Sequence, residues 1–297
     1  MSRPQDIIGL SSFEGASMSA IGIINPGAMG ISIAASARSG GHDVSWASAG
    51  RSADTRQRAE AHNLLEVQTL AELCAVCEVM LCVCPPHAAA SVADSVIDAG
   101  FSGLYCDGNA IAPRQSQLIG ERLRAAGIDF VDGSIIGPPA WEAGSTRFYL
   151  SGPSAGQVAG LFEGALAEAV VIGDEIGKAS ALKMVFAAQT KGFTALLSAI
   201  QGAAEQLGVR ADLDREWARR DMAVAAQRVN QVRGVTGKAW RFAGEMQEIA
   251  ATFESAGMPP GFFEAAHDIY QRMAPFKDAE ELPALEDVLA ALTAARD

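Results

Sequence analysis

Lys183 and Lys191 are the residues of this sequence whose type and spacing best suit proton transfer. They lie in the stretch KASALKMVFAAQTKGFTALLSAIQGAAEQLGV, which has no proline and is rich in alanine and leucine. Such a stretch predicts one long helix. Spacings of three, four, seven and eight share a helix face. One face therefore carries two lysines separated by small and hydroxylated side chains: Lys183, Ala187, Thr190, Lys191 and Thr194.

The apolar neighbours of Lys183 suit it to acid–base chemistry. Leu182, Met184, Val185 and Phe186 flank it, and desolvation lowers the pKa of a lysine because it disfavours the ammonium form. A neutral lysine can accept the proton of a substrate hydroxyl, and an ammonium can return it. We predict Lys183 as the catalytic acid–base and Lys191 as a substrate-binding residue. The sequence leaves open which of the two transfers the proton.

A dinucleotide-binding loop is predicted at IGIINPGAMG, after the first β-rich run. Its last six residues fit the pattern G-x-G-x-x-G, except that Asn25 replaces the first glycine. Asparagine tolerates left-handed backbone angles, Gly27 lets the backbone approach a pyrophosphate, and Gly30 lets helix and strand pack closely. The following helix points its N–H groups and positive dipole end at the phosphates. The predicted cofactor contacts here are Asn25, Pro26, Gly27, Ala28, Met29 and Gly30.

The end of the second predicted strand favours NADP over NAD. NAD enzymes place an acidic residue about 20 residues past the loop to bind the ribose hydroxyls. In SWASAGRSADTRQR no acid appears before Asp54, and Ser48, Arg51 and Ser52 occupy the turn. A guanidinium with hydroxyls suits a 2′-phosphate. We therefore predict NADP, with NADPH preferred over NADH; a solvated loop arginine is the alternative interpretation of Arg51.

Three further sites are predicted. Asn109 lies at the carboxyl edge where such sheets bind ligands, Cys84 and Pro85 lie in the earlier run VMLCVCP, and Ser134 lies in DGSIIGPP. Cys84 and Pro85 end VMLCVCP and join the predicted cofactor contacts. Asn109 follows GLYCD and is predicted to bind the cofactor or the substrate, with capping of the next helix as the alternative. Ser134 is predicted to donate a hydrogen bond to the substrate, with a turn role equally open.

The order of the elements predicts the fold. The β-rich runs AIGIIN, DVSWAS, VMLCVC, GLYCD, IDFVD, RFYLSG and AVVIG alternate with helical runs, as in a parallel, doubly wound sheet covered on both faces. Beyond Gly177 strand patterns disappear. We predict an α/β Rossmann-type sheet followed by an all-α C-terminal domain. The expected parts are a flexible extension (1–18), an NADP-binding Rossmann domain (19–176) and an all-helical substrate and dimerisation domain (177–297).

Composition excludes several classes of protein. With 49% hydrophobic and 20% charged residues the chain can bury a sizeable core, which argues against disorder. A net charge of -12 without a basic stripe argues against nucleic acid. No run reaches the length of a membrane helix or a signal-peptide centre. Four of five cysteines crowd into CAVCEVMLCVC, and its second part, EVMLCVCP, predicts a buried strand in which cysteine acts as a small hydrophobic residue. We expect a cytoplasmic protein without bound metal or membrane contact.

Taken together, the motifs resemble the β-hydroxyacid dehydrogenase superfamily, which includes 3-hydroxyisobutyrate dehydrogenases and the cofactor domain of 6-phosphogluconate dehydrogenase. IGIINPGAMG is similar to its I-G-F-I-G-L-G-x-M-G opening, CDGNAIAP to D-x-S-T-x-x-P, and FVDGSIIGPP to D-A-P-V-S-G-G. IGKASALKMVFAA resembles G-x-G-x-x-x-K-x-x-N-N, which implies Lys183 as the catalytic lysine. The likeness extends from about residue 20 to the C-terminus. It is closest to a phosphogluconate-dehydrogenase-like subgroup with its own C-terminal domain, and it implies a homodimer formed through the helices.

The sequence departs from the family where the substrate is held. The family serine that binds a substrate carboxylate falls on Ile136, and the asparagine one turn after the lysine falls on Ala187. The family's K-D pair falls on Gln247 and Glu248. Because two polar substrate contacts are missing, a 3-hydroxy acid substrate does not follow from the resemblance.

Three functions are compatible with these residues. The first is an NADP-dependent oxidoreductase that interconverts an alcohol (a hydroxy acid or a related, more apolar small molecule) and a carbonyl by hydride transfer. The second is imine reduction, although imine reductases resemble this architecture without the lysine at this position. The third is a non-catalytic NADP-binding protein.

Overall fold

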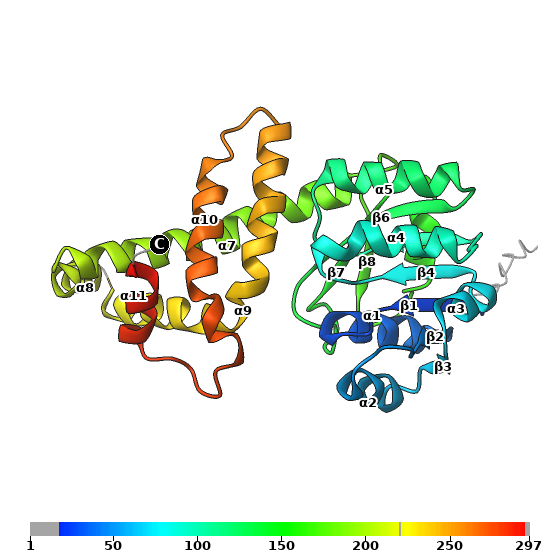
Figure 1. The fold of residues 1–297 in the computed structure, drawn as a ribbon, viewed down its shortest axis with the longest axis horizontal. Helices are drawn as coiled ribbons and strands as arrows, with labels where there is room; N and C mark the ends of the chain where they lie inside the picture. Colours follow the sequence, from blue (N-terminus) through cyan, green and yellow to red (C-terminus); the bar gives the residue numbers. More distant parts are fainter. Residues whose placement is uncertain (1–17, 220, 295–297) are drawn as a thin grey trace, which may run out of the picture.

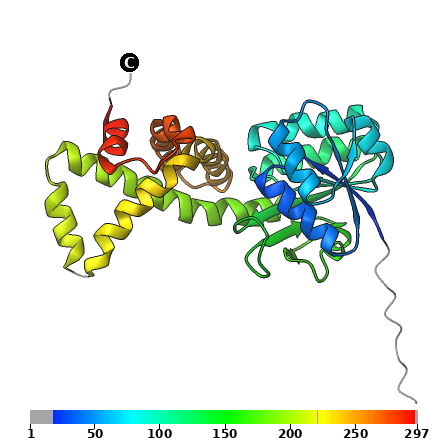
Figure 2. The ribbon, with the colours of Figure 1, turned by 90° about the horizontal axis from the view of Figure 1, so that it is seen from below.

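The computed structural model describes residues 18–219 and 221–294 as two lobes joined by one long helix. Helix α7 (Lys178–Gln206) leaves the sheet and runs into the helical lobe (Figures 1 and 2). Apart from Met18, the predicted N-terminal extension lies outside the described residues. No helix in the described part of the chain is long and apolar enough to cross a membrane.

An eight-stranded sheet forms the first lobe, in the order β3-β2-β1-β4-β5-β6-β7-β8. Its strands are β1 (Ala20–Ile24), β2 (Asp43–Ala47), β3 (Leu65–Val67), β4 (Val79–Cys82), β5 (Leu104–Asp107), β6 (Asp129–Ile136), β7 (Arg147–Ser151) and β8 (Glu168–Val171). The first six are parallel and have the strand order of dinucleotide-binding folds. The prediction of a Rossmann-type sheet followed by helices is confirmed.

The last two strands correct the expectation of an entirely parallel sheet. Strand β7 pairs antiparallel with β6, so that Asp132 lies opposite Ser151, and β8 follows the direction of β7. A parallel return needs a crossover of a dozen or more residues, and residues 137–146 are too few for one. Strand β3 and helix α3 (Leu70–Val76) were not predicted either, because such short elements carry no clear periodicity.

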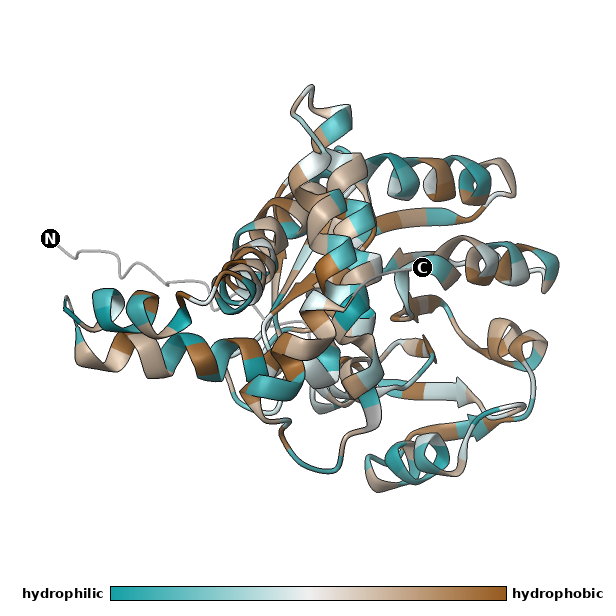
Figure 3. Ribbon diagram, turned by 60° about the vertical axis from the view of Figure 1, so that its left-hand side comes forward, coloured by the Kyte–Doolittle hydropathy of each residue, from teal (hydrophilic) through white to brown (hydrophobic). Residues whose placement is uncertain are grey.

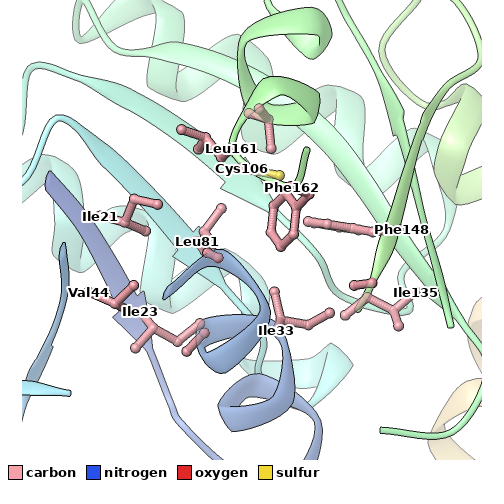
Figure 4. Close-up of a cluster of buried hydrophobic side chains, with 14 of the residues drawn as sticks. Ile21, Ile23, Ile33, Val44, Leu81, Cys106, Ile135, Phe148, Leu161 and Phe162 are labelled. Carbon is pink, nitrogen blue, oxygen red and sulfur yellow. The ribbon is translucent and has the colours of Figure 1, made fainter. Parts of the chain in front are cut away.

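Helices pack on both faces of the sheet, as predicted. Helices α1 (Ala28–Ser39), α2 (Ala53–Ala61) and α6 (Ala155–Gly160) contribute to the core on one face. Helices α3, α4 (Ala89–Asp98) and α5 (Pro113–Ala125) contribute to the core on the other, and the short η1 (Pro86–Ala88) precedes α4. Figure 4 shows the first core, where Phe148 and Phe162 meet edge to face with ring centres 5.5 Å apart. These buried side chains hold the strand ends in fixed positions.

The helical lobe consists of α7 with α8 (Arg210–Ala218), α9 (Met222–Ser255), α10 (Gly261–Met273), η2 (Ala274–Asp278) and α11 (Leu285–Thr293). Apolar and polar segments alternate along the helices (Figure 3), as expected for helices that bury one face. The sequence GMPPG separates α9 from α10, as predicted.

Helix α9 corrects a second expectation. The runs DLDREWARRDMAVAAQRVNQ and KAWRFAGEMQEIAATFESAG predicted two helices, but the break lies earlier, between α8 and α9, and α9 continues for 34 residues. Gly234 and Gly237 lie inside it. Val235 and Thr236 beside them are buried in the lobe, and this tertiary packing outweighs the modest helix penalty of glycine.

Asp132 on β6 ties the helical lobe to the sheet. Its carboxylate is 1% exposed and accepts hydrogen bonds from side chains and backbone groups of α5, β7 and the start of α7. The donors are the hydroxyls of Ser116 (2.8 Å), Ser151 (2.9 Å) and Ser180 (2.6 Å) and the N–H groups of Gly177 (3.0 Å) and Ser180 (3.0 Å). The unsatisfied N–H groups and positive end of α7 stabilise this charge.

Replacing Asp132 with alanine is expected to lower the free energy of unfolding by about 3 kcal/mol, because buried donors lose a charged acceptor. Urea unfolding followed by circular dichroism measures this change. Asp129→Ala is the matched control, because Asp129 begins the same strand but is exposed; it should change the free energy by less than about 0.5 kcal/mol. Equal losses in the two variants would contradict this role for Asp132.

Candidate active site

The loop after β1 has the backbone geometry of a phosphate-binding turn. Asn25 adopts a left-handed conformation with φ 61°, in agreement with its expected tolerance of such angles. A Cβ atom at Gly30 would lie 2.5 Å from the carbonyl oxygen of Asn25, so α1 can approach β1 this closely only with glycine there. A Cβ at Gly27 would meet nothing nearer than 4.0 Å. The backbone at Gly27 is therefore open to a ligand.

The remaining loop residues extend this turn into the first helix. Pro26 is buried, Ala28 is exposed at the start of α1, and Met29 packs partly against the core. Two predicted contacts present buried polar atoms without a partner in the described structure, namely Asn25 Oδ1 and the Ser48 hydroxyl. Buried polar atoms are normally hydrogen-bonded. These orphaned atoms fit a site that takes polar groups from a bound dinucleotide.

A cavity of about 170 Å³ lies beside the loop, at the carboxyl ends of β1 and β2. Asn25 and Arg51 line it, together with the apolar side chains of Leu70, Leu73 and Val92. Apolar walls with a few polar groups at the rim are typical of sites that bind a flat aromatic ring. Arg51 thus lies at a cavity beside the predicted cofactor loop.

Arg58 is a residue of this region that the sequence interpretation missed. Its Nε atom donates to the carbonyl oxygen of Pro26 (3.5 Å), and its Nη2 atom donates to the Thr55 hydroxyl (3.1 Å). Ser52 caps α2 by accepting the N–H of Thr55 (3.3 Å). Residues 52, 55 and 58 have helical spacing, which was the available signal. Arg56 also lies here, because its Nη2 atom donates to the carbonyl oxygen of Ser48 (2.9 Å). Three guanidinium groups, not one, therefore lie near this turn.

Asn109 joins the carboxyl ends of β4 and β5. Its Oδ1 atom accepts the N–H of Cys84 (2.5 Å), and its Nδ2 atom donates to the Cys82 sulfur (3.5 Å). It thereby fixes Cys84 and the following Pro85 at the sheet edge. Ala112, not Asn109, is the N-cap residue of α5, so the capping alternative is wrong. Burial raises the pKa of the neighbouring Asp107 to about 7, and repulsion by Asp132 contributes to this rise.

Lys183 reaches from α7 to the end of β6. Its Nζ atom donates to the carbonyl oxygen of Ile135 (2.7 Å). Burial lowers its pKa to about 8; the positive charge of Lys191 adds to this effect and the negative charge of Glu245 opposes it. Ser134 precedes Ile135, and its buried hydroxyl has no partner in the part of the chain that the structure describes. Lys183 and Ser134 thus lie at the same strand end.

Lys191 has a partner that the sequence did not predict. Its ammonium group forms an ion pair with Glu245 of α9 and lies 4.4 Å from the ring centre of Phe242. The two charged side chains keep only 17% and 14% of their surface exposed. Thr190, on the predicted face, is exposed and donates to the carbonyl oxygen of Phe186 in its own helix (3.3 Å). Helix α9 therefore supplies a charged partner to the polar face of α7.

Glu248 makes a second connection between the lobes. Its carboxylate accepts the N–H of Ala112 (2.7 Å), and burial raises its pKa. The adjacent Gln247 is exposed and lies 3.5 Å from a ring nitrogen of His267. The position corresponding to the family's aspartate thus links α9 to the start of α5.

The cysteines pack inside the sheet lobe. Cys74, Cys77, Cys82 and Cys106 are buried, and burial raises the pKa of Cys77 to about 12. Neutral thiols of this kind behave as small hydrophobic groups. Within residues 18–219 and 221–294, no group of three or more His, Cys, Asp and Glu side chains has an arrangement that could hold a metal ion.

Two family models match the chain. Residues 20–159 match the NAD binding domain of 6-phosphogluconate dehydrogenase, and residues 204–273 match a domain of unknown function, DUF1932. The first match contains the cofactor loop and the strand ends described above. This match and the solved structures below are consistent with the β-hydroxyacid dehydrogenase superfamily. The predicted resemblance is therefore confirmed, and the protein is an NAD(P)-dependent oxidoreductase with an NAD(P)-binding domain.

Solved structures share the fold. A conserved protein of unknown function, described as similar to 3-hydroxyacid dehydrogenases, is 25% identical over 86% of this chain and 97% of its own, with a TM-score of 0.64. Mycobacterium tuberculosis 3-hydroxyisobutyrate dehydrogenase is 17% identical over 94% and 100%, with a TM-score of 0.67. A Streptomyces aurantiacus imine reductase is 17% identical over 91% and 98%, with a TM-score of 0.53. No curated protein is similar enough in sequence to match the chain.

Proposed function

We propose that the protein interconverts an alcohol and a carbonyl with NADP, and that Lys183 is the acid–base. The observation that carries this proposal is the Lys183 ammonium group held at the carboxyl end of β6, with its pKa lowered to about 8. A general acid–base works best when its pKa lies near the working pH. The bound nicotinamide would supply or accept the hydride.

The protein's own groups provide the proton path and the orientation of the substrate. Neutral Lys183 accepts the proton of a substrate hydroxyl, and the ammonium form returns a proton to the oxygen of a carbonyl. The carbonyl oxygen of Ile135 keeps Nζ at the strand end. We assign to Ser134, whose buried hydroxyl has no partner among the described residues, a hydrogen bond to the same substrate oxygen. Asn109 acts by positioning Cys84 and Pro85 at the nicotinamide end.

The two other functions compatible with the sequence, imine reduction and non-catalytic NADP binding, require different residues in the site. Imine reduction does not require a lysine beside the reacting carbon, and a binding protein requires no acid–base at all. Lys183 with its lowered pKa therefore favours alcohol–carbonyl chemistry. A panel of hydroxy acids, ketones and cyclic imines, assayed with NADPH and NADH, separates the three readings. We assign cofactor binding to a domain of residues 19–176 and the remaining helices to substrate binding and dimerisation.

The NADP preference gives the first test of this proposal. Arg51 lines the cavity at the adenosine end and no acidic side chain shares its turn. Arg51→Ala is expected to weaken NADPH binding by about 1 to 3 kcal/mol, the range for hydrogen bonds to charged groups, and to leave NADH binding nearly unchanged. Fluorescence titration of both cofactors measures this. Arg114→Ala, which removes an exposed arginine of α5, is the control, and equal losses for both cofactors would rule out 2′-phosphate recognition.

The acid–base role predicts a specific kinetic defect. Lys183→Met should slow turnover by about 10² to 10⁴-fold and leave cofactor affinity nearly intact. Because the pKa of Lys183 is about 8, alcohol oxidation in the wild type should rise with pH through this value and carbonyl reduction should fall. In the variant, neither rate should show this change with pH near 8. Lys178→Met, at the exposed start of the same helix, should behave as wild type.

Retention of more than about half the wild-type rate in Lys183→Met, far outside the range for acid–base catalysis, would contradict this role. The proton would then pass to Lys191 or to an ordered water, and imine reduction would gain support.

We also propose a homodimer formed by the helical lobe. An apolar groove of about 610 Å³ lies between α7 and α10, and Phe193 and Phe262 beside it are 64% and 78% exposed. Exposed apolar surfaces of this kind often mark a protein–protein interface, which supports the proposal. Phe193→Glu should produce monomers at micromolar concentration in sedimentation velocity experiments. Leu118→Glu, at an exposed apolar position on α5, should leave the dimer intact, and a monomeric wild type would refute the proposal.

A further inference from the structure

Glu245 is a charged residue that the proposed chemistry does not use. It lies on α9 and forms an ion pair with Lys191. The two side chains are 17% and 14% exposed, whereas those of the Arg210–Glu205 pair in the same lobe are 29% and 43% exposed. Removing charges from water is costly, so a largely buried ion pair is weak evidence for a stabilising role. Its position suggests a different use.

The charges of this pair reach the acid–base. Lys191 lowers the pKa of Lys183 and Glu245 raises it, so each charge is felt at the Lys183 Nζ atom and the two effects oppose each other. A substrate that is hydrogen-bonded to Lys183 and extends along α7 toward Lys191 experiences the electric fields of both Lys191 and Glu245. Glu245 therefore offsets part of the positive field that Lys191 alone would present to that substrate.

The surroundings of the pair lack the two polar contacts that the family uses to hold a substrate carboxylate. Ile136 and Ala187 replace the family's serine and asparagine, and Ala187 is 1% exposed. The ring of Phe242 packs against the ammonium group of Lys191. A carboxylate that approached Lys191 would meet the Glu245 carboxylate bound to the same ammonium group, and like charges at this distance repel.

We propose that Glu245 determines substrate specificity: by holding Lys191 in an ion pair, it makes the site select an uncharged carbonyl compound or alcohol over a carboxylate-bearing one. This proposal rests on the proposed function for the location of the substrate, between Lys183 and Lys191. In this proposal the partner of Lys191 is Glu245, a residue of the chain itself, and not an anionic group of the substrate.

The test measures binding rather than turnover. Isobutyramide and isobutyrate have the same shape and differ in charge, and neither can be oxidised or reduced at a hydroxyl or ketone. Titration of each into the complex of the full chain with NADP⁺ gives their dissociation constants. We expect the wild type to bind the amide about tenfold more tightly or better. Glu245→Gln should improve isobutyrate binding by about tenfold, the effect of one unopposed charge contact, and change amide binding by less than about threefold.

Glu205→Gln is the matched control, because it neutralises a paired carboxylate on the far part of the same lobe; both dissociation constants should stay at the wild-type values. Tighter binding of isobutyrate by the wild type, an unchanged amide-to-carboxylate ratio in Glu245→Gln, or binding of neither probe would overturn the proposal. Preference for isobutylamine would also overturn it, because Glu245 would then recruit a cation. If Glu245→Gln does not fold, the ratio of the two dissociation constants in the wild type still tests whether the site selects the uncharged probe.

The proposed function has a separate readout. Failure of the wild type to turn over any alcohol, ketone or aldehyde would refute alcohol–carbonyl chemistry, while the charge selectivity measured with isobutyramide and isobutyrate would stand. Turnover of carboxylate-free substrates together with tight isobutyrate binding would refute the selectivity alone.

Discussion

The position of α7 depends on one buried carboxylate. Asp132 accepts donors from α5, β7 and the first turn of α7, so three separate elements share one charge. Ser180, which donates to Asp132 through both its backbone and its hydroxyl, precedes Lys183 by less than one helical turn. The height of Lys183 above the strand end is therefore fixed by Asp132, and the bond from Lys183 to the Ile135 carbonyl follows from it. Glu248 adds a second connection, from α9 to the start of α5.

Features that depend on residues close together in sequence could be predicted. The left-handed Asn25 and the close packing at Gly30 follow from one strand, one turn and one helix, and the motif already specifies all three. The alternation of β-rich and helical runs likewise predicted the doubly wound sheet. The direction of the pKa change of Lys183 agrees with the prediction, and burial is its main cause. The predicted source of that burial was only partly right, because the neighbours Val185 and Phe186 are 51% and 44% exposed.

Features that depend on contacts between segments far apart in sequence could not be predicted. The partners Lys191 and Glu245 are 54 residues apart, and Glu248 and Ala112 are 136 apart; no local pattern pairs them. The direction of β7 depends on a loop too short for a crossover, and the continuity of α9 depends on packing that outweighs two glycines. Arg58 was missed for the same reason, since its contact with Pro26 joins residues 32 apart. Tertiary contacts decide each of these cases.

The two lysines of α7 show how environment separates side chains of one type on one helix face. Lys183 is bonded to a neutral carbonyl oxygen and is largely removed from water, so its ammonium form is destabilised and its proton becomes exchangeable near neutral pH. Lys191 lies two turns further along and forms an ion pair with the Glu245 carboxylate of α9. Both lysines lie on the same face of α7, so the difference between them arises from their neighbours. Lys183 contacts β6, and Lys191 contacts α9. The helical lobe thus contributes the counter-charge that pairs with Lys191, while burial at the end of β6 lowers the pKa of Lys183.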